Sequence, residues 1–329
     1  SFSDSGKNLS FIVDADTKKK QVRHKELDLW RDGNKQAVKL VDNPSAPKNY
    51  LVSADGTISF SKDETKLYFG LAKPPIVKDT MLLDEEIVNV EVWTYNEPQL
   101  YTVQEIQLKN DLKKSYETVI HLKNDKLIQL ATVEFPAAEI GNEGNALFAL
   151  INTSLPYELE SQWTGQNAKD YAIVNVNTGE TIEILKNIAG RVMLSPNGKY
   201  AYGFNPVERQ WFTVNLTSKK LQKLTSSQVF YDELNDSPDH PNSYGLAGWT
   251  TNDTAIIIYD RYDIWEFNPD NGQSRKLTNG RDSKIIFRYA KIDAEERFIP
   301  TDKDWLLTNF NEINKYSDYY KLTFITLKV

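Results

Sequence analysis

A repeated pattern, in which a polar turn precedes a run of mostly apolar residues, constrains this chain more than any other feature. The turns are rich in Ser, Asp, Asn and Gly, the residue types that tight connections need. The six copies begin at residues 3, 61, 142, 195, 251 and 301, and the last one is degenerate. Their spacing is roughly 50–60 residues, except for about 80 between the second and third copies. A period of this size indicates one supersecondary unit per copy.

Each of four copies is followed by a second hairpin, read as a strand, a polar turn and another strand. These hairpins cover residues 28–40, 171–185, 211–224 and 264–277. Two hairpins per repeat give four strands, which is the content of one β-propeller blade. Most strands leave no room for crossover helices between them, so an α/β fold is excluded. The sequence therefore predicts an all-β chain, a β-propeller of four-stranded blades with about six blade starts, as one domain over residues 1–329.

The interval of about 80 residues between the second and third copies of the repeat predicts an insertion over about residues 71–115. Its first part, Leu71–Val90, holds two prolines and an acidic cluster and is expected to be a loop. The residues after Pro98 follow helical spacing imperfectly and predict one amphipathic helix. Tyr116–Leu122 then reads as a strand, which returns the chain to the repeat.

Propeller connectivity assigns the connections to two ends of each blade. The repeated turns join first and second strands, so they share one end with the turns that join third and fourth strands. The long or unusual segments fall at the other end, and loops held by a rigid scaffold are where function collects. These segments are residues 14–24, 71–90, 153–169, 205–209 and 225–246.

Composition removes several classes of function. Lys and Arg number 39 and Asp and Glu 46, so the net charge is 39 − 46 = −7, which disfavours nucleic acid as a partner. No apolar run reaches the roughly 18–20 residues that a membrane-spanning helix needs. Cysteine is absent, and no Gly-X-Ser-X-Gly motif occurs that would present a serine nucleophile. The three histidines therefore have no such serine to serve, and no catalytic residue is assigned.

No metal site or cofactor is expected either. Two short acidic runs, Asp14–Asp16 and Asn268–Asp270, resemble fragments of calcium-binding loops. Both lack the glycine and the terminal glutamate of that pattern, so they are interpreted as turn residues.

Three glutamates at the loop end are the candidates for substrate binding: Glu85 and Glu86 in the acidic cluster, and Glu158, which lies near Glu160. Two carboxylates that flank a sugar bond are the minimum for glycosidase chemistry, so a glycan-active propeller is a third reading of the function. The alternative for each carboxylate is a solvated acidic loop.

Tyr259–Trp265 is the densest cluster of polar and aromatic residues in the chain. One interpretation makes Arg261 an anion-binding group at a rim. The favoured interpretation is structural: Asp260 or Asp263 pairs with Arg261 and nearby backbone, which fastens two strands across a very short connection.

Several segments resemble the prolyl oligopeptidase family of serine peptidases, and above all the large bacterial members called dipeptidyl aminopeptidase or acylaminoacyl-peptidase. The segments that carry the resemblance cover most of the chain and are residues 58–70, 78–100, 244–253, 259–265 and 287–293. In that family an N-terminal propeller caps a C-terminal α/β-hydrolase domain with a Ser-Asp-His triad and limits access to short peptides.

The resemblance implies a serine peptidase as the parent protein, with short peptides as substrates and its own hydrolase domain as the partner of this chain. The sequence stops at Val329 without that domain, so the chain alone is predicted to be inactive. Dipeptidyl peptidases of the family hold the substrate's amino terminus with a propeller glutamate pair. Glu85 and Glu86 are a possible counterpart, although Met81–Leu83 replace the aromatic residues that flank that pair.

The main alternative is a stand-alone propeller that binds a protein or envelope partner. The compartment is left open, with a periplasmic or secreted location preferred to a cytoplasmic one. Because the chain begins on a motif and ends in a strand, the ring of blades is expected to be incomplete. Exposed strand edges would then favour dimerisation or low solubility.

Overall fold

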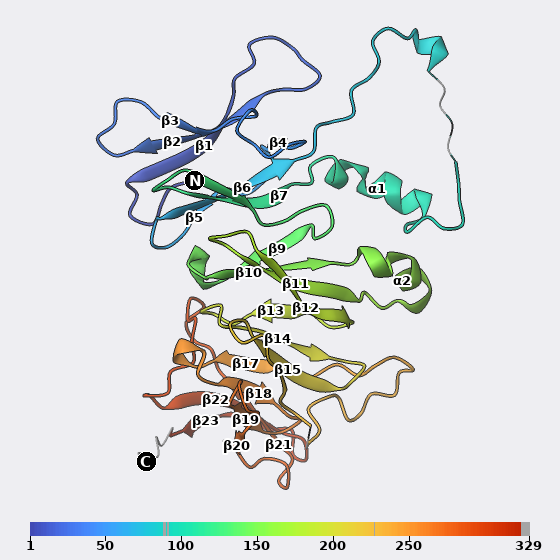
Figure 1. Cartoon of the computed structure of the whole chain (residues 1–329). Helices are drawn as coiled ribbons and strands as arrows, with labels where there is room; N and C mark the ends of the chain where they lie inside the picture. The colour runs from blue at the N-terminus through green and yellow to red at the C-terminus, as the bar shows by residue number, and fades with distance from the viewer. Residues whose placement is uncertain (88–89, 91, 227, 324–329) are drawn as a thin grey trace. The chain divides into compact units, whose positions relative to one another are not determined.

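The computed structural model describes residues 1–87, 90, 92–226 and 228–323 of the chain (Figure 1). The chain forms two compact units, Ser1–Glu183 and Ile184–Val329. Both are built of antiparallel sheets in which strands that follow one another in sequence lie side by side.

The first unit contains three sheets and two α-helices. The first sheet has β1 (Asn8–Asp14), β2 (Lys25–Arg31) and β3 (Val38–Val41). The second has β4 (Leu51–Val52), β5 (Ser59–Phe60), β6 (Lys66–Ala72), β7 (Tyr116–His121) and β8 (Lys126–Gln129). The third has β9 (Ala137–Ile140), β10 (Phe148–Thr153), β11 (Lys169–Asn175) and β12 (Thr181–Ile188). The helices are α1 (Tyr101–Asp111) and α2 (Glu158–Thr164).

The second unit contains three further sheets. The fourth sheet has β13 (Val192–Leu194), β14 (Tyr200–Asn205), β15 (Gln210–Asn215) and β16 (Leu221–Lys223). The fifth has β17 (Leu246–Trp249), β18 (Ile256–Tyr259), β19 (Ile264–Phe267) and β20 (Ser274–Lys276). The sixth has β21 (Ile285–Tyr289), β22 (Trp305–Asn311) and β23 (Ser317–Leu322).

The third, fourth and fifth sheets each have four strands in the order of the sequence, which is the connectivity of a propeller blade. In the second sheet, β4 and β5 both pair with β6, so they form one interrupted first strand. The predicted fold class, an all-β chain of propeller blades with a helix in the insertion, is therefore confirmed. A further helix, α2, forms where the sequence indicated only a loop.

Two segments of the chain approach each other closely in the second sheet, which explains a pair of glycines there. A side chain at Gly56 would meet the Cα of Gly70 at 2.5 Å, which no Cβ tolerates. Glycine at both positions lets the interrupted first strand lie directly against β6.

Sheets within each unit pack face to face, and the central strands lose water on both sides. In β18, Ile256 and Ile258 pack in a cluster shared with the fourth sheet, whereas Ile257 packs in a cluster shared with the sixth. In β6, Leu67 packs toward the first sheet and Tyr68 toward the third. Side chains alternate along a strand, so burial of both faces explains why these strands are continuously apolar in sequence.

The repeated turns fasten the first sheet to the second and the fourth sheet to the fifth. Asp253, in the turn before β18, accepts hydrogen bonds from Ser195 Oγ at 2.6 Å and from the backbone N–H of Asn197 at 3.1 Å. Both donors belong to the turn before β14, and Asp253 is 1% exposed. In the first unit, Glu64 accepts from the Ser5 N–H at 2.6 Å and from Asn8 Nδ2 at 2.7 Å. We call these carboxylate contacts between consecutive turns the turn staples.

Removal of the Asp253 carboxylate should destabilise the second unit. Asp253→Ala leaves the Ser195 hydroxyl and a backbone N–H without their acceptor in a buried site, at an expected cost of about 2–4 kcal/mol. Chemical unfolding followed by tryptophan fluorescence measures the loss. The matched control is Asp236→Ala, in an exposed loop, which should change stability by less than about 0.5 kcal/mol. Equal stability of the two variants would show that the staple contributes nothing.

Candidate functional site

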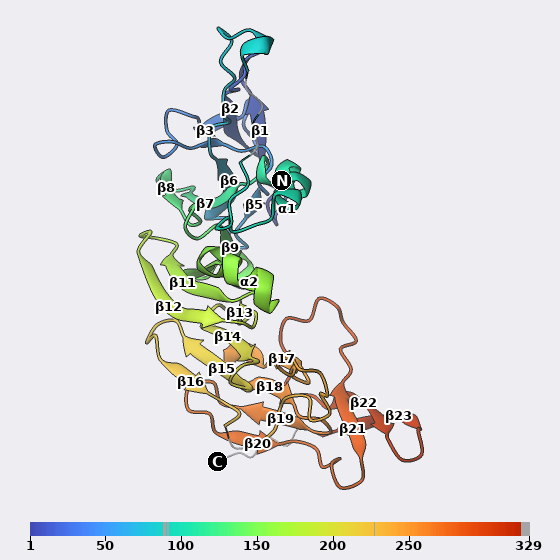
Figure 2. The ribbon, with the colours of Figure 1, turned by 90° about the vertical axis from the view of Figure 1, so that its right-hand side faces the viewer.

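The loop end of the first unit carries its three longest strand-to-strand connections. They cover residues 15–24, between β1 and β2, residues 73–115, between β6 and β7, and residues 154–168, between β10 and β11. The stapled turns occupy the other end of the same sheets. Figures 1 and 2 show the chain leaving the sheet after β6, and α1 leading back into β7. Long connections without staples make this end the place to look for a site.

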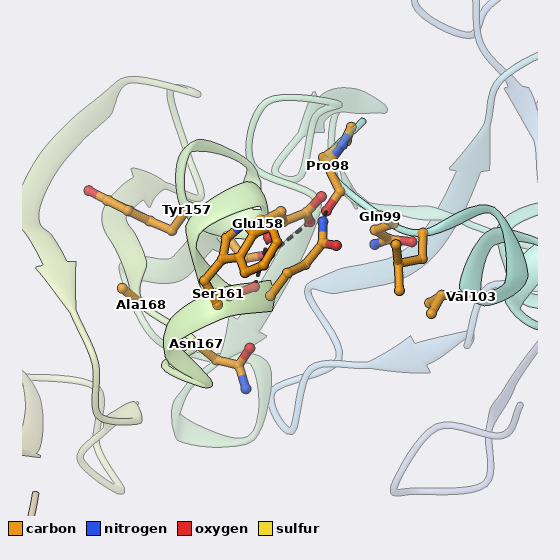
Figure 3. A pocket seen from close by; sticks show the side chains of 12 residues that line it. Pro98, Gln99, Val103, Tyr157, Glu158, Ser161, Asn167 and Ala168 are labelled. Carbon is orange, nitrogen blue, oxygen red and sulfur yellow. Dashed lines mark hydrogen bonds between the residues drawn. The ribbon is translucent and has the colours of Figure 1, made fainter. Parts of the chain in front are cut away.

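A cavity of about 520 Å³ lies between the insertion and α2 (Figure 3). We call it the Glu158 cavity. Its largely apolar walls come from Pro98, Leu100, Val103, Tyr157, Trp163 and Ala168. Its polar groups come from Gln99, Ser154, Glu158, Ser161, Gln162 and Asn167. Among the described residues that line this cavity, Glu158 is the only carboxylate, and the volume suits part of a small ligand.

Local sequence explains why α2 forms and where it ends. Pro156 stands in the preceding 3₁₀ turn, and Glu158 and Glu160 occupy the first turn of α2, where a carboxylate is favourable for the helix dipole. Gly165 ends the helix at φ 69°, a left-handed conformation that glycine adopts without strain. The helix thereby holds Glu158 at the start of its first turn, facing the cavity.

Hydrogen bonds position the side chains around the cavity. Ser154 Oγ donates to Glu158 Oε1 at 3.1 Å, so this carboxylate has one neutral partner. Tyr157 donates its hydroxyl proton to Asp170 Oδ1 at 2.6 Å, which anchors the residue before α2 to β11. Glu158 is half-buried and Glu160 is exposed. A half-buried carboxylate without a cationic partner is able to receive a positively charged group.

One glutamine joins α2 to the insertion. Gln162 Nε2 donates to the backbone carbonyl of Pro98 and lies 3.4 Å from that of Glu97. We call this contact the Gln162 latch. On the insertion side, the rings of Trp93 and Tyr101 stack with centroids 5.2 Å apart, which braces the segment that enters α1. Pro98, Gln99, Leu100 and Val103 form the side of the cavity that the insertion contributes.

The two adjacent glutamates of the insertion lie elsewhere. Residues 84–86 form a single 3₁₀ turn, and Glu86 Oε2 accepts a hydrogen bond from the Leu83 N–H at 2.9 Å. Neither Glu85 nor Glu86 lines the Glu158 cavity. Of the three glutamates singled out from the sequence, Glu158 alone borders it. Tyr157, Gln162 and Trp163 also border it, and no local sequence signal identified them.

The Tyr259–Trp265 motif lies in the second unit and makes a tight turn. Asp260 Oδ1 accepts from the N–H groups of Tyr262 at 2.7 Å and Asp263 at 2.6 Å, and its Oδ2 accepts from Trp265 Nε1 at 3.0 Å. Asp263 Oδ1 accepts from Thr278 Oγ1 at 2.8 Å. Both aspartates are thus buried hydrogen-bond acceptors that shape the β18–β19 connection.

Arg261 has a different partner from the one expected. Its guanidinium lies 3.0 Å from Glu312 Oε1, and the Tyr262 hydroxyl donates to Glu312 Oε2 at 2.8 Å. The charge of Arg261 is therefore balanced by a glutamate of the β22–β23 turn, not by Asp260 or Asp263. Hydrogen bonding to Tyr262 and Arg261 also holds the pKa of Glu312 below its usual range. This pairing joins the fifth sheet to the sixth.

No metal-binding cluster of three or more His, Asp or Glu side chains occurs among the described residues. Asp270 accepts from the Tyr200 hydroxyl at 2.8 Å and from Asn215 Nδ2 at 2.9 Å, so it serves as a link between turns. His121 Nε2 lies 3.0 Å from the backbone oxygen of Val176. Among the helices that the structure describes, none is long and apolar enough to cross a membrane.

A strongly perturbed carboxyl group lies outside the cavity, on β7. Burial raises the pKa of Glu117 to about 7. Strand alternation places Glu117 on the same side of β7 as Val119, which packs in the cluster shared by the second and third sheets. This perturbed group therefore belongs to the packing between sheets, not to the site.

The raised pKa predicts a pH dependence of stability. The folded state favours the protonated Glu117, so its contribution is fully present below about pH 4.5 and is lost as the pH rises to about 7. Glu117→Gln should remove this slope and gain roughly 1–3 kcal/mol over the native chain at pH 8. Unfolding free energies at several pH values measure it. Parallel pH profiles for the two proteins would contradict the prediction.

No family model matches the chain, and no curated protein matches it. Among solved structures, TolB from Acinetobacter baumannii is 10% identical, with 90% of this chain and 59% of that chain covered and a TM-score of 0.32. Porphyromonas gingivalis dipeptidyl peptidase 4 is 10% identical, with 98% and 45% covered and a TM-score of 0.42.

The β-propeller domain of the Trilobed protease from Pyrococcus furiosus is also 10% identical. There, 83% of this chain and 72% of that chain are covered, with a TM-score of 0.34. The chain spans less than two thirds of the length of the TolB and dipeptidyl peptidase chains. Similarity at this level does not assign an activity.

Proposed function

We propose that this chain is the non-catalytic propeller domain of a prolyl-oligopeptidase-like serine peptidase, over residues 1–329, and that it admits and docks short peptides. The observation that carries the proposal is the Glu158 cavity at the loop end of the first unit. In the proposed whole protein, a separate hydrolase domain supplies the nucleophile. The propeller's part is to select and orient the substrate.

The chemistry of the cavity supports a peptide's amino end as its ligand. A free amino terminus is a cation at neutral pH and sits beside a side chain that is often apolar. Glu158 offers the carboxylate, while Trp163, 86% exposed, and its apolar neighbours offer a surface for the side chain. Charge-assisted hydrogen bonds in partly dry sites are the stronger kind, so one carboxylate is sufficient to fix the orientation.

Exposed apolar side chains on the insertion support a docking role. Ile76 is fully exposed, Tyr95 is 98% exposed and Ile106, on α1, is 79% exposed. Helix α1 buries none of its residues, and an isolated helix of 11 residues is marginal in water. In our proposal the hydrolase domain of the same protein covers part of this surface.

The chain by itself should not hydrolyse peptides. With dipeptidyl and acylaminoacyl chromogenic substrates, we expect no turnover above the buffer rate, because in our proposal the serine nucleophile belongs to the separate hydrolase domain. The control is the same chain joined to the domain encoded downstream, which should turn over. Turnover by the isolated chain that disappears on a single substitution would contradict the proposal, and a stop codon after Val329 would favour the stand-alone propeller.

Glu158→Gln should weaken binding of peptides that have a free amino end. Loss of one charge-assisted bond is expected to lower affinity by about 10- to 100-fold, measured by calorimetry. Glu160→Gln, on the same helix but outside the cavity, is the matched control and should bind like the native chain. Amino-terminally acetylated peptides should bind weakly to all three proteins. Equal affinity for free and acetylated peptides would exclude this role of Glu158.

A further inference from the structure

A second cavity lies at the loop end of the first unit, between the β1–β2 connection and the base of the insertion. Its volume is about 400 Å³. Its charged lining consists of Arg23, Lys25, Lys73 and Lys114 against Asp55 and Asp111. Its four cations and two carboxylates give the lining a net charge of 4 − 2 = +2, in a chain whose net charge is −7. We call this space the lysine cavity.

Three of its cations form no ion pair with a carboxylate among the described residues, although the charge of Lys73 acts on Glu134. Arg23 Nε lies 2.6 Å from Asp14 Oδ2, so its charge is balanced. In the described part of the chain, Lys25 and Lys114 have no carboxylate within ion-pairing distance. Lys73 Nζ lies 3.9 Å from the centroid of the Tyr50 ring, a cation–π contact that leaves its charge in place. A net positive charge around a cavity lowers the free energy of a bound anion.

Helix α1 extends from one cavity to the other. Leu100 and Val103, at its first turn, line the Glu158 cavity, and Asp111 and Lys114, at its end, border the lysine cavity. The helix has 11 residues, so at 1.5 Å per residue it is about 16 Å long. An extended peptide advances about 3.3 Å per residue, so about five residues cover that length.

We propose that the lysine cavity binds the C-terminal carboxylate of the peptide whose amino group is held by Glu158. The length of α1 then determines which peptide length can reach both cavities. This inference rests on the proposed function and adds a substrate class to it: free peptides of about five residues with both ends uncapped. Opposite charges at the two ends of the site also fix the direction in which the peptide lies.

The test uses synthetic peptides from about three to about eight residues with a free amino end and either a carboxylate or an amide at the other end. Binding to the native chain is measured by calorimetry. We expect the carboxylate to improve affinity about tenfold at about five residues, and less in shorter peptides. The variant Lys25→Gln/Lys114→Gln should lose this preference. Lys113→Gln, which lines neither cavity, is the matched control and should keep it.

The outcomes separate this inference from the function on which it rests. Equal binding of carboxylate and amide peptides, still dependent on Glu158, would overturn the lysine cavity as a peptide site and leave the Glu158 cavity standing. Absence of all peptide binding would overturn both. If inorganic phosphate binds as tightly as the peptides and the peptides show no optimum of length, the lysine cavity is a general anion site. That result would overturn the proposed selection of peptides by length. Unchanged binding of amide peptides by the double variant verifies that it is folded.

Discussion

Burial of both faces of the central strands is the constraint on which the rest of each unit depends. Ile257 packs against one neighbouring sheet while Ile256 and Ile258 pack against another, so no face of β18 remains for a ligand. Around these central strands, a site can therefore form only at the two ends of the sheet. The turn staples of Asp253 and Glu64 occupy one end, where short turns keep stacked sheets in register. The long connections are left with the other end, where the Glu158 cavity and the lysine cavity lie.

The separation of structural from functional polar groups follows from the same packing. Asp253, Asp260 and Asp263 are almost fully buried, and each accepts hydrogen bonds from backbone N–H groups or hydroxyls. Such carboxylates are bound by the scaffold and are not available to a ligand. Glu158 differs because it is half-buried and accepts its hydrogen bond from a neutral hydroxyl, that of Ser154. Partial burial with an unmatched charge, more than acidity itself, distinguishes a group that can bind from one that holds the fold.

Much of the fold could be predicted from the sequence because its signals are local. Turn residues followed by continuous apolar runs located the strands, and α1 lies where helical spacing followed Pro98. The site was harder to predict because it depends on contacts between distant segments. Glu158 was identified only as one of several acidic residues, and Gln162 meets Pro98 across 64 positions. The pairing of Arg261 with Glu312, 51 positions apart, was missed for the same reason, since neighbouring aspartates were the only partners visible in sequence.

The Gln162 latch has a consequence for how such a site can change. Its acceptors are the main-chain oxygens of Pro98 and Glu97, which every residue type provides. Substitution of Pro98, which lines the cavity, therefore alters the cavity wall while the contact to the main chain persists. A loop held through its backbone is free to diversify, as antibody loops do on a fixed framework. Substitutions in the insertion can thus change the ligand preference of the site during evolution. The contact that holds this segment to α2 is kept without any compensating change.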